Sequence, residues 1–153
     1  MTKTITPLIV EAAQQASGLI KYMDKLVHTL AEARMSYAKA KVEFEKRKEE
    51  HSAVVRSRLV EVASAPHNQN IIDPRTGKSN AEWTKLVIEE QMDNDPAVMG
   101  SFGNLTLARD LLIQEENNVL NLADEIGALK AQAHLLTAIL SYSNFSPPPV
   151  EGE

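Results

Sequence analysis

The apolar residues between Ile5 and Phe44 recur in alternating steps of four and three residues. They are Ile5, Ile9, Ala12, Ala16, Leu19, Met23, Leu26, Leu30, Ala33, Tyr37, Ala40 and Phe44. The same register then continues through a more polar stretch that contains Arg47, His51, Val54 and Arg58. A 3.5-residue repeat sustained over this length is typical of a coiled-coil seam, because only a strip facing another helix must stay in line. We therefore predict one α-helix over about residues 6–63, capped by Thr6 with Pro7 in its first turn.

A second heptad pattern in the last third of the chain predicts a second long helix. Its seam is Leu105, Ala108, Leu112, Glu115, Val119, Leu122, Ile126, Leu129, Ala133, Leu136 and Leu140. We expect this helix to begin at Pro96, or at Asn104 if Gly100 and Gly103 break it, and to end at about residue 142. Further apolar residues widen the stripe and indicate contact with more than one partner helix: Leu111, Ile113, Leu120, Leu135 and Ile139.

The connection between these two helices contains a loop and a short helix. Pro66 and the turn sequence of residues 73–77 predict a loop over residues 64–78. Ser79 and Glu82 fit a capping box, in which each side chain accepts a hydrogen bond from the backbone of the other residue. We therefore predict a short helix over residues 79–93. Trp83 lies on its apolar stripe, and we expect the ring to be the anchor that docks this helix onto the long pair.

These elements predict an all-α fold, a long antiparallel coiled-coil hairpin with a short intervening helix. We expect one domain over residues 1–142 and a disordered, Pro-rich acidic tail over residues 143–153. A single hairpin leaves apolar surface exposed, so self-association into a homo-oligomeric bundle is also expected. If Leu19 lies near Leu140, Glu115 falls opposite Phe44 and within a turn of Arg47. Glu115 then either pairs with Arg47 or extends to solvent.

The charge of the chain is divided unevenly between its two halves. Residues 1–78 carry thirteen Lys/Arg against nine Asp/Glu, a net of +4, and residues 79–153 carry three against twelve, a net of −9. Such segregation suits segments that pack against each other, within one chain or between subunits. The sequence has no cysteine, no signal-peptide pattern and no apolar run of about eighteen residues. We therefore expect a soluble, cytoplasmic protein without a membrane partner.

None of the catalytic, cofactor or metal motifs that we tested is complete in this sequence. Gly77-Lys78-Ser79 matches the end of a phosphate-binding loop, but Ile72 stands where the first glycine is required. Glu90-x-x-Asp93 supplies only the second half of the magnesium motif of helical nucleotide pyrophosphohydrolases. Zinc or di-iron spacing is absent around the four histidines, His28, His51, His67 and His134. We therefore expect no enzyme activity, no cofactor and no metal site.

A basic run in the first helix is the candidate partner-binding face. It consists of Arg34, Lys39, Lys41, Lys46, Lys48, Arg56 and Arg58. Nucleic-acid binding by this run requires its charges to align on one face of the helix. Interleaved acids, such as Glu43 four residues before Arg47, are instead typical of a solvated, salt-bridged face. The sequence leaves both a protein partner and nucleic acid open.

The order of the elements resembles that of a group of small phage proteins. A long Lys/Glu-rich helix is followed by Gly77-Lys78-Ser79-Asn80-Ala81-Glu82, a short helix, an Asp95-Pro96 restart and a long helix containing Leu129-Lys130-Ala131. Over residues 20–140 this layout is similar to helical-hairpin accessory proteins of bacteriophages and prophages, and in outline to the UvsY-type recombination mediators. The resemblance implies a non-catalytic interaction or assembly module in the host cytoplasm, acting on DNA metabolism or host machinery. The alternative is a nucleic-acid-binding mediator that uses the basic run.

Overall fold

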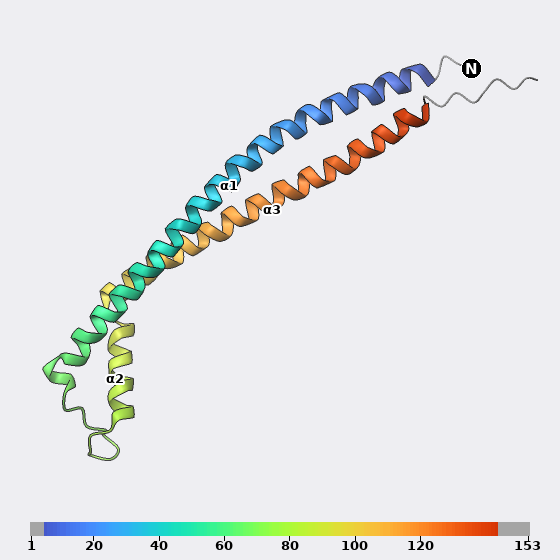
Figure 1. Ribbon diagram of the computed structural model, residues 1–153. Helices are drawn as coiled ribbons and strands as arrows, with labels where there is room; N and C mark the ends of the chain where they lie inside the picture. Colours follow the sequence, from blue (N-terminus) through green and yellow to red (C-terminus); the bar gives the residue numbers. More distant parts are fainter. Residues whose placement is uncertain (1–4, 144–153) are drawn as a thin grey trace, which may run out of the picture. The chain divides into compact units, whose positions relative to one another are not determined.

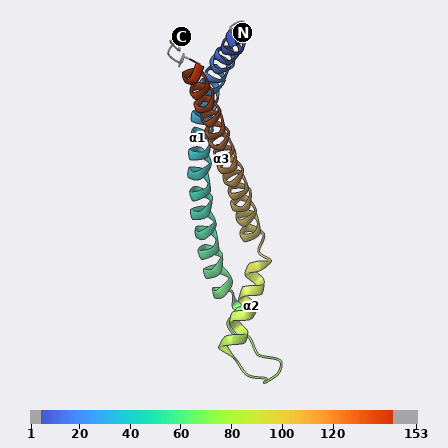
Figure 2. The same ribbon diagram turned by 90° about the vertical axis from the view of Figure 1, so that its right-hand side faces the viewer.

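The structure, a computed structural model, describes residues 5–143, and this part of the chain is all-α. Its elements in order are α1 (Ile5–Ser64), the short 3₁₀ helix η1 (Pro66–Asn68), α2 (Ala81–Asp93) and α3 (Pro96–Ser143). Figures 1 and 2 show that α3 pairs with α1 and that α2 is inserted between the loop and the start of α3. The expected fold class, an all-α helical hairpin with a short intervening helix, is confirmed.

The chain divides into two compact units, and each long helix contributes a segment to both. Unit 1 consists of Met1–Ser36 and Glu116–Glu153, and unit 2 is Tyr37–Glu115. Unit 1 therefore pairs the first half of α1 with the second half of α3. Unit 2 holds the rest of both helices together with η1, the loop and α2.

The core of unit 1 is a narrow strip along the predicted seam. Leu26, Leu30 and Ile126 are buried together. The half-buried residues packed against them also occupy seam positions, and they are Val119, Leu122 and Leu129. Toward the ends of the two helices the remaining seam residues are half-buried: Ile9, Ala12, Ala16, Leu19, Met23, Ala133, Leu136 and Leu140. The heptad repeat thus places one row of side chains from each helix between the two backbones.

In unit 2 the seam continues, with smaller and more polar side chains. Ala40 and Ala108 are buried. Larger residues of the seam are half-buried, namely Tyr37, Phe44, Leu105 and Leu112. Small residues such as Ala40 and Ala108 let the backbones of two packed helices approach closely.

The register of the two helices in unit 2 differs from the expected one. His51 contacts Ser101, whereas a Leu19–Leu140 pairing would have placed Ala108 opposite His51, one heptad later along α3. Arg47 lies beside Ala108 and Leu111, rather than near Glu115, which is half-buried. A shift of seven residues keeps every seam residue in the seam, so the repeat alone did not distinguish these registers.

The helix boundaries follow the predictions except at the starts of α1 and α2. α1 already includes Ile5, so Thr6 lies inside the helix. α3 begins at Pro96, the first of the two expected starts, and continues through both glycines. α2 begins at Ala81, and its cap is Asn80, whose side chain accepts a hydrogen bond from the Glu82 N–H at 2.9 Å. The predicted Ser79 cap is therefore wrong: Ser79 instead forms an isolated antiparallel bridge with Ile72. The predicted tail, apart from Ser143, lies outside the described residues.

Replacing Leu30 by alanine should destabilise the protein because the side chain is 9% exposed and belongs to the core of unit 1. We expect a loss of about 2–3 kcal/mol, the low end for a buried leucine, because the seam is a single layer of side chains. Urea unfolding followed by circular dichroism measures it. Val27→Ala is the control, since Val27 is 50% exposed on the same helix and should change stability by about 0.5 kcal/mol or less. Equal effects of the two substitutions would contradict this core.

Candidate interaction site

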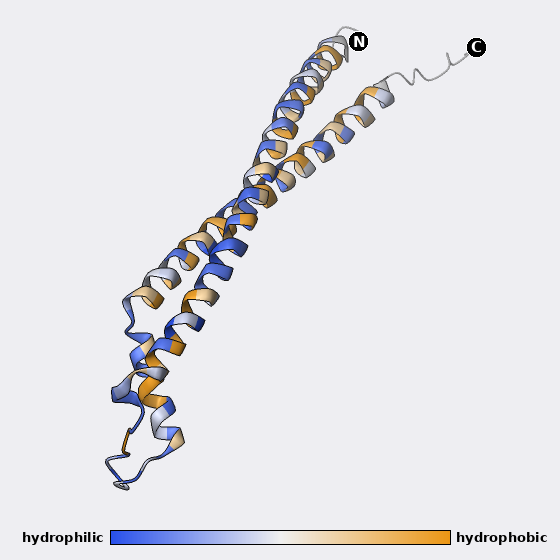
Figure 3. Cartoon of the chain, turned by 60° about the vertical axis from the view of Figure 1, so that its left-hand side comes forward, coloured by the Kyte–Doolittle hydropathy of each residue, from blue (hydrophilic) through white to orange (hydrophobic). Residues whose placement is uncertain are grey.

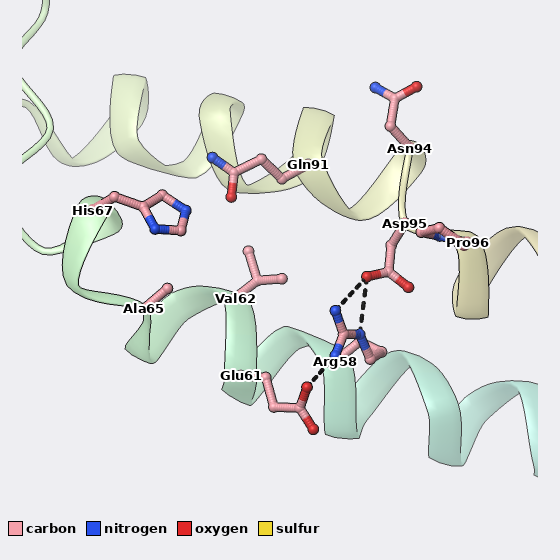
Figure 4. Close-up of a pocket in the computed structure, with 9 residues that line it drawn as sticks. All are labelled: Arg58, Glu61, Val62, Ala65, His67, Gln91, Asn94, Asp95 and Pro96. Atoms are coloured by element: carbon pink, nitrogen blue, oxygen red, sulfur yellow. Dashed lines mark hydrogen bonds and ion pairs between the residues drawn. The ribbon is translucent and has the colours of Figure 1, made fainter.

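A partly buried ion pair fixes the corner where α1 meets the start of α3 in unit 2. Two guanidinium nitrogens of Arg58, Nε and Nη2, donate to one carboxylate oxygen of Asp95 at 2.9 and 2.7 Å. Asp95 is only 6% exposed. The third nitrogen of Arg58 donates to Glu61, one turn further along α1. Figure 4 shows Arg58 held between the two carboxylates, so its charge is neutralised within the fold.

Asp95 is also the cap of α3. Its other carboxylate oxygen accepts the backbone N–H groups of Ala97 and Val98 at 3.0 and 3.2 Å, the groups that a helix start otherwise leaves without an intrahelical acceptor. The hydrogen bond from Arg58 holds the pKa of Asp95 below its ordinary value, against the opposing effect of burial, and the two N–H groups add to the lowering. One carboxylate thus caps α3 and attaches it to α1.

An open cavity of about 440 Å³ lies beside this corner. Figure 4 shows that its walls come from the end of α1, η1, the end of α2 and the start of α3. Its lining residues are Arg58, Glu61, Val62, Ala65, His67, Gln91, Asn94, Asp95 and Pro96. The charged groups of the Arg58 cluster bind one another, so this arrangement explains how the corner is held.

Two further contacts attach the connection between α1 and α2. The side-chain amides of Asn68 and Gln91 exchange two hydrogen bonds, at 2.8 and 3.0 Å, and Asn68 is only 4% exposed. In the loop, Asp73 is 1% exposed and accepts the Arg75 backbone N–H at 2.8 Å, which lowers the pKa of this carboxyl. Arg75 in turn lies over the half-buried ring of Trp83, 5.9 Å from its centroid. The predicted anchor therefore faces the loop.

His51 replaces an apolar seam residue through a defined hydrogen bond. Its Nδ1 lies 2.8 Å from the Ser101 hydroxyl, which itself donates to the Val98 carbonyl oxygen at 3.0 Å. A hydroxyl has a single proton, so Nδ1 of His51 must be the donor in this contact. The imidazole ring also lies against Phe102, with 5.8 Å between the ring centroids. His51 is thus a structural part of the seam.

The structure distributes the predicted basic face over different sides of α1. Lys41 and Lys48 are seven residues apart and share one side, whereas Lys39 and Lys46 share another side, about 160° away around the helix. Lys46 and Lys48 each form an ion pair with a nearby glutamate of α1. Arg34 stands seven residues before Lys41, and Arg56 stands eight after Lys48, so both fall on or next to the side of Lys41 and Lys48. Arg58 is turned inward toward Asp95.

An apolar groove of about 220 Å³ lies between α1 and α3 on one flank of unit 2. From α3 it is lined by Leu107, Ala108, Leu111 and the polar Asn104, and Leu107 and Leu111 are 70% and 45% exposed. From α1 it is lined by Glu43 and Arg47, which are ion-paired at 2.7 Å. Apolar side chains flanked by charged ones are usual in a protein–protein interface. The sequence indicated Leu111 through the widened stripe, but the groove depends on the register and was not predicted.

The side chains and helices of residues 5–143 bear on two further classes of site, metal centres and membrane spans. In that range, no three His, Asp or Glu side chains gather closely enough to hold a metal ion. None of the helices described here combines the length and apolar character needed to cross a bilayer.

Acidification should weaken unit 2 through Asp95. Because the folded state holds this pKa below the ordinary 3.8, Asp95 contributes stability above that pH and loses it as the pH falls through the lower folded value. Asp95→Asn should therefore be less stable than wild type at pH 7 and should lose less stability between about pH 5 and 2. Urea unfolding followed by the fluorescence of Trp83, the single tryptophan, measures both effects.

Glu61→Gln is the control for this experiment, because Glu61 contacts the same arginine but its side chain is 58% exposed. An exposed ion pair contributes little to stability, so this variant should follow the wild-type pH dependence. If Asp95→Asn also followed the wild-type curve, the carboxylate would not couple α3 to α1.

Arg47 should couple to its neighbours in α1 and not to Glu115. Its guanidinium donates to Glu43 at 2.7 Å and to Glu50 at 2.9 Å. In double-mutant cycles with alanine, the Arg47–Glu43 pair should therefore show an interaction energy, whereas the effects of Arg47→Ala and Glu115→Ala should add. Stability from urea unfolding supplies the four values of each cycle. Coupling between Arg47 and Glu115 would restore the register first expected from the sequence.

The comparisons with known proteins do not identify a function for this chain. No protein-family model, no curated protein and no solved structure matches the chain. The resemblance to phage helical hairpins therefore stays a prediction.

Proposed function

We propose that this chain is a non-catalytic protein-interaction and assembly module. The observation that supports this best is the number of large apolar side chains that lie at the surface, outside the seam. Among the described residues, twenty such side chains are exposed, whereas seven hydrophobic residues are buried. Figure 3 shows hydrophobic residues, coloured orange, recurring along the helices, those of the seam included. Single exposed apolar residues are ordinary, but rows of them on several faces are typical of surfaces that other proteins cover.

The groove in unit 2 is the part of this surface whose shape best indicates the kind of partner that would bind it. It runs between two helices, and its apolar side chains Leu107 and Leu111 are four residues apart, so they lie next to each other on α3. An amphipathic helix from a partner protein fits such a groove by adding a third helix along the pair. Glu43 and Arg47, which also line the groove, are already ion-paired. At the edge of such an interface they would stay in contact with water, so binding would not require their desolvation.

The arrangement of the basic residues gives nucleic acid less support than a protein partner. Phosphate contacts along a strand require cations on one face. Here Lys39 and Lys46 stand on a different side of α1 from Lys41 and Lys48, and Lys46 and Lys48 are each paired with a glutamate. The inward-facing Arg58 has a buried carboxylate as its partner. The proposed roles in phage DNA metabolism or host takeover, and the host cytoplasm as the location, stay predictions from the order of elements.

The test is a comparison of proteins captured by the wild-type chain and by a groove variant, Leu107→Ser with Leu111→Ser, from extracts of the source organism. We expect a protein that binds the wild type and is lost, by tenfold or more, from the variant. Quantitative mass spectrometry measures the ratio, and circular dichroism shows that the variant keeps its helices. The control is Ile113→Ser, which removes an apolar side chain that is 48% exposed on another side of α3.

Retention of nucleic acid is measured on the same columns at about 50 and 200 mM salt. Binding that falls steeply between these concentrations would favour the recombination-mediator alternative, because phosphate contacts release counterions. Equal capture by the wild type and by the groove variant would refute the role of the groove.

A further inference from the structure

A second heptad row runs along α3 in unit 1, on the side of the helix opposite to the seam. Each member stands two positions after a seam residue, and the members are Ala128, Ala131, Leu135, Ala138 and Tyr142. We call these five residues the outer row. Two residues correspond to about 200° around an α-helix, so the outer row faces away from α1. All five are exposed, and Leu135 and Tyr142 are 65% and 86% exposed.

The equivalent heptad positions of α3 are polar in the turns that precede the outer row. Asn117, Asn121 and Asp124 hold the equivalent positions in unit 1, and all three are exposed. The row turns apolar only at Ala128. Moreover, Lys130, which is not part of the row, is the one Lys, Arg, Asp or Glu between residues 126 and 142. The side of a helix that faces water is ordinarily polar, so this change indicates a strip that another helix covers.

We propose that the outer row is a self-association surface, which pairs antiparallel with the outer row of a second copy about an axis between Leu135 and Ala138. This inference rests on the assembly role proposed above and names one interface for it. The sizes of the side chains supply the first argument. In this register Leu135 faces Ala138 of the second copy, and Tyr142 faces Ala131 of the second copy. Each large residue then meets a small one, as close packing requires.

The parallel alternative packs less well. It would place Tyr142 against Tyr142 and Leu135 against Leu135, while the alanines between them would face each other. Crowded layers would then alternate with layers that leave gaps, and both kinds destabilise an interface. The antiparallel arrangement also opposes the dipoles of the two helices, whereas the parallel one brings like ends together.

The size of the surface predicts a reversible dimer. Ile139, which is 56% exposed, lies next to the outer row and enlarges the apolar area. A standard stable interface covers about 800 Å² on each partner, more than these six side chains of one helix provide. We therefore expect a monomer–dimer equilibrium with a dissociation constant on the order of micromolar. In such an equilibrium the subunits exchange, so two variants that are mixed can form a mixed dimer.

The test uses the full-length chain and opposite charges beside the proposed axis. Leu135→Lys and Leu135→Glu should each be monomeric in sedimentation equilibrium at concentrations where the wild type dimerises. Their one-to-one mixture should recover the dimer, because unlike charges then meet across the axis. A loss of folding cannot produce this recovery. Leu120→Lys is the control, since Leu120 is 54% exposed in unit 1 but lies beside the polar turns of α3, and it should dimerise like the wild type.

Cysteine cross-linking tests the direction of the pair, and the natural sequence contains no cysteine that interferes. Ala131→Cys and Tyr142→Cys should form disulfide-linked dimers when mixed, about tenfold more than either variant alone. A parallel pair would instead link each variant to its own copy. Asn121→Cys, on the polar part of the same side, is the matched control and should link to neither variant.

A monomeric wild type over the whole concentration range, or a dimeric Leu135→Lys, would overturn the proposed interface. Either result leaves partner capture by the groove of unit 2 unaffected, because that test changes other residues in another unit. Failure of the interface is therefore distinguishable from failure of the proposed function.

Discussion

A seam between two helices buries one strip of each helix and no more, and most features of this protein follow from that limit. The 3.5-residue repeat keeps the strip in line, so Leu26, Leu30 and Ile126 meet in a core that is one side chain thick. Most large apolar residues of α1 and α3 outside the strip stay at the surface. The protein therefore combines a small buried core with exposed apolar rows, and we propose that further helices are added through these rows.

At the polar end of the seam, hydrogen bonds and an ion pair hold the two helices together in place of apolar packing. In unit 2, His51 and Arg58 occupy seam positions and use directed contacts to Ser101 and Asp95 in place of packing. Asp95 carries two functions at once, because it caps α3 and binds the arginine of α1. The corner is consequently held by hydrogen bonds and charge. Such contacts fix the geometry sharply, and they make this unit sensitive to protonation in a way that the leucine core is not.

The sequence predicted the parts of the structure that depend on spacing and missed those that depend on register. Every seam position from Ile9 to Arg58 and from Leu105 to Leu140 is buried or half-buried, because the phase of a heptad repeat is a local property of the chain. The choice of partner residues is not local, since a slide of seven residues preserves the phase. The Arg47–Glu115 pair and the groove both belong to that second kind of feature.

One further error has a local cause. Ser79 and Asn80 are both good helix caps, and the bridge to Ile72 uses Ser79 and leaves the cap to Asn80. The basic run stays a prediction, and the structure shows only how its members are arranged. Lys39 and Lys41 are two residues apart and point to different sides of α1, whereas Lys41 and Lys48 are seven apart and share one side.

The two units are nested in the chain, and this sets the order in which they can fold. Unit 2 is the continuous segment Tyr37–Glu115, whereas unit 1 needs residues from both sides of it. The Arg58–Asp95 contact closes a loop of 37 residues, and the Tyr22–Glu125 contact closes one of 103. Shorter loops cost less chain entropy, so we expect unit 2 to form first on the growing chain and unit 1 to follow after the second half of α3 has been synthesised. During that interval the apolar seam of the first half of α1 lacks its partner from α3.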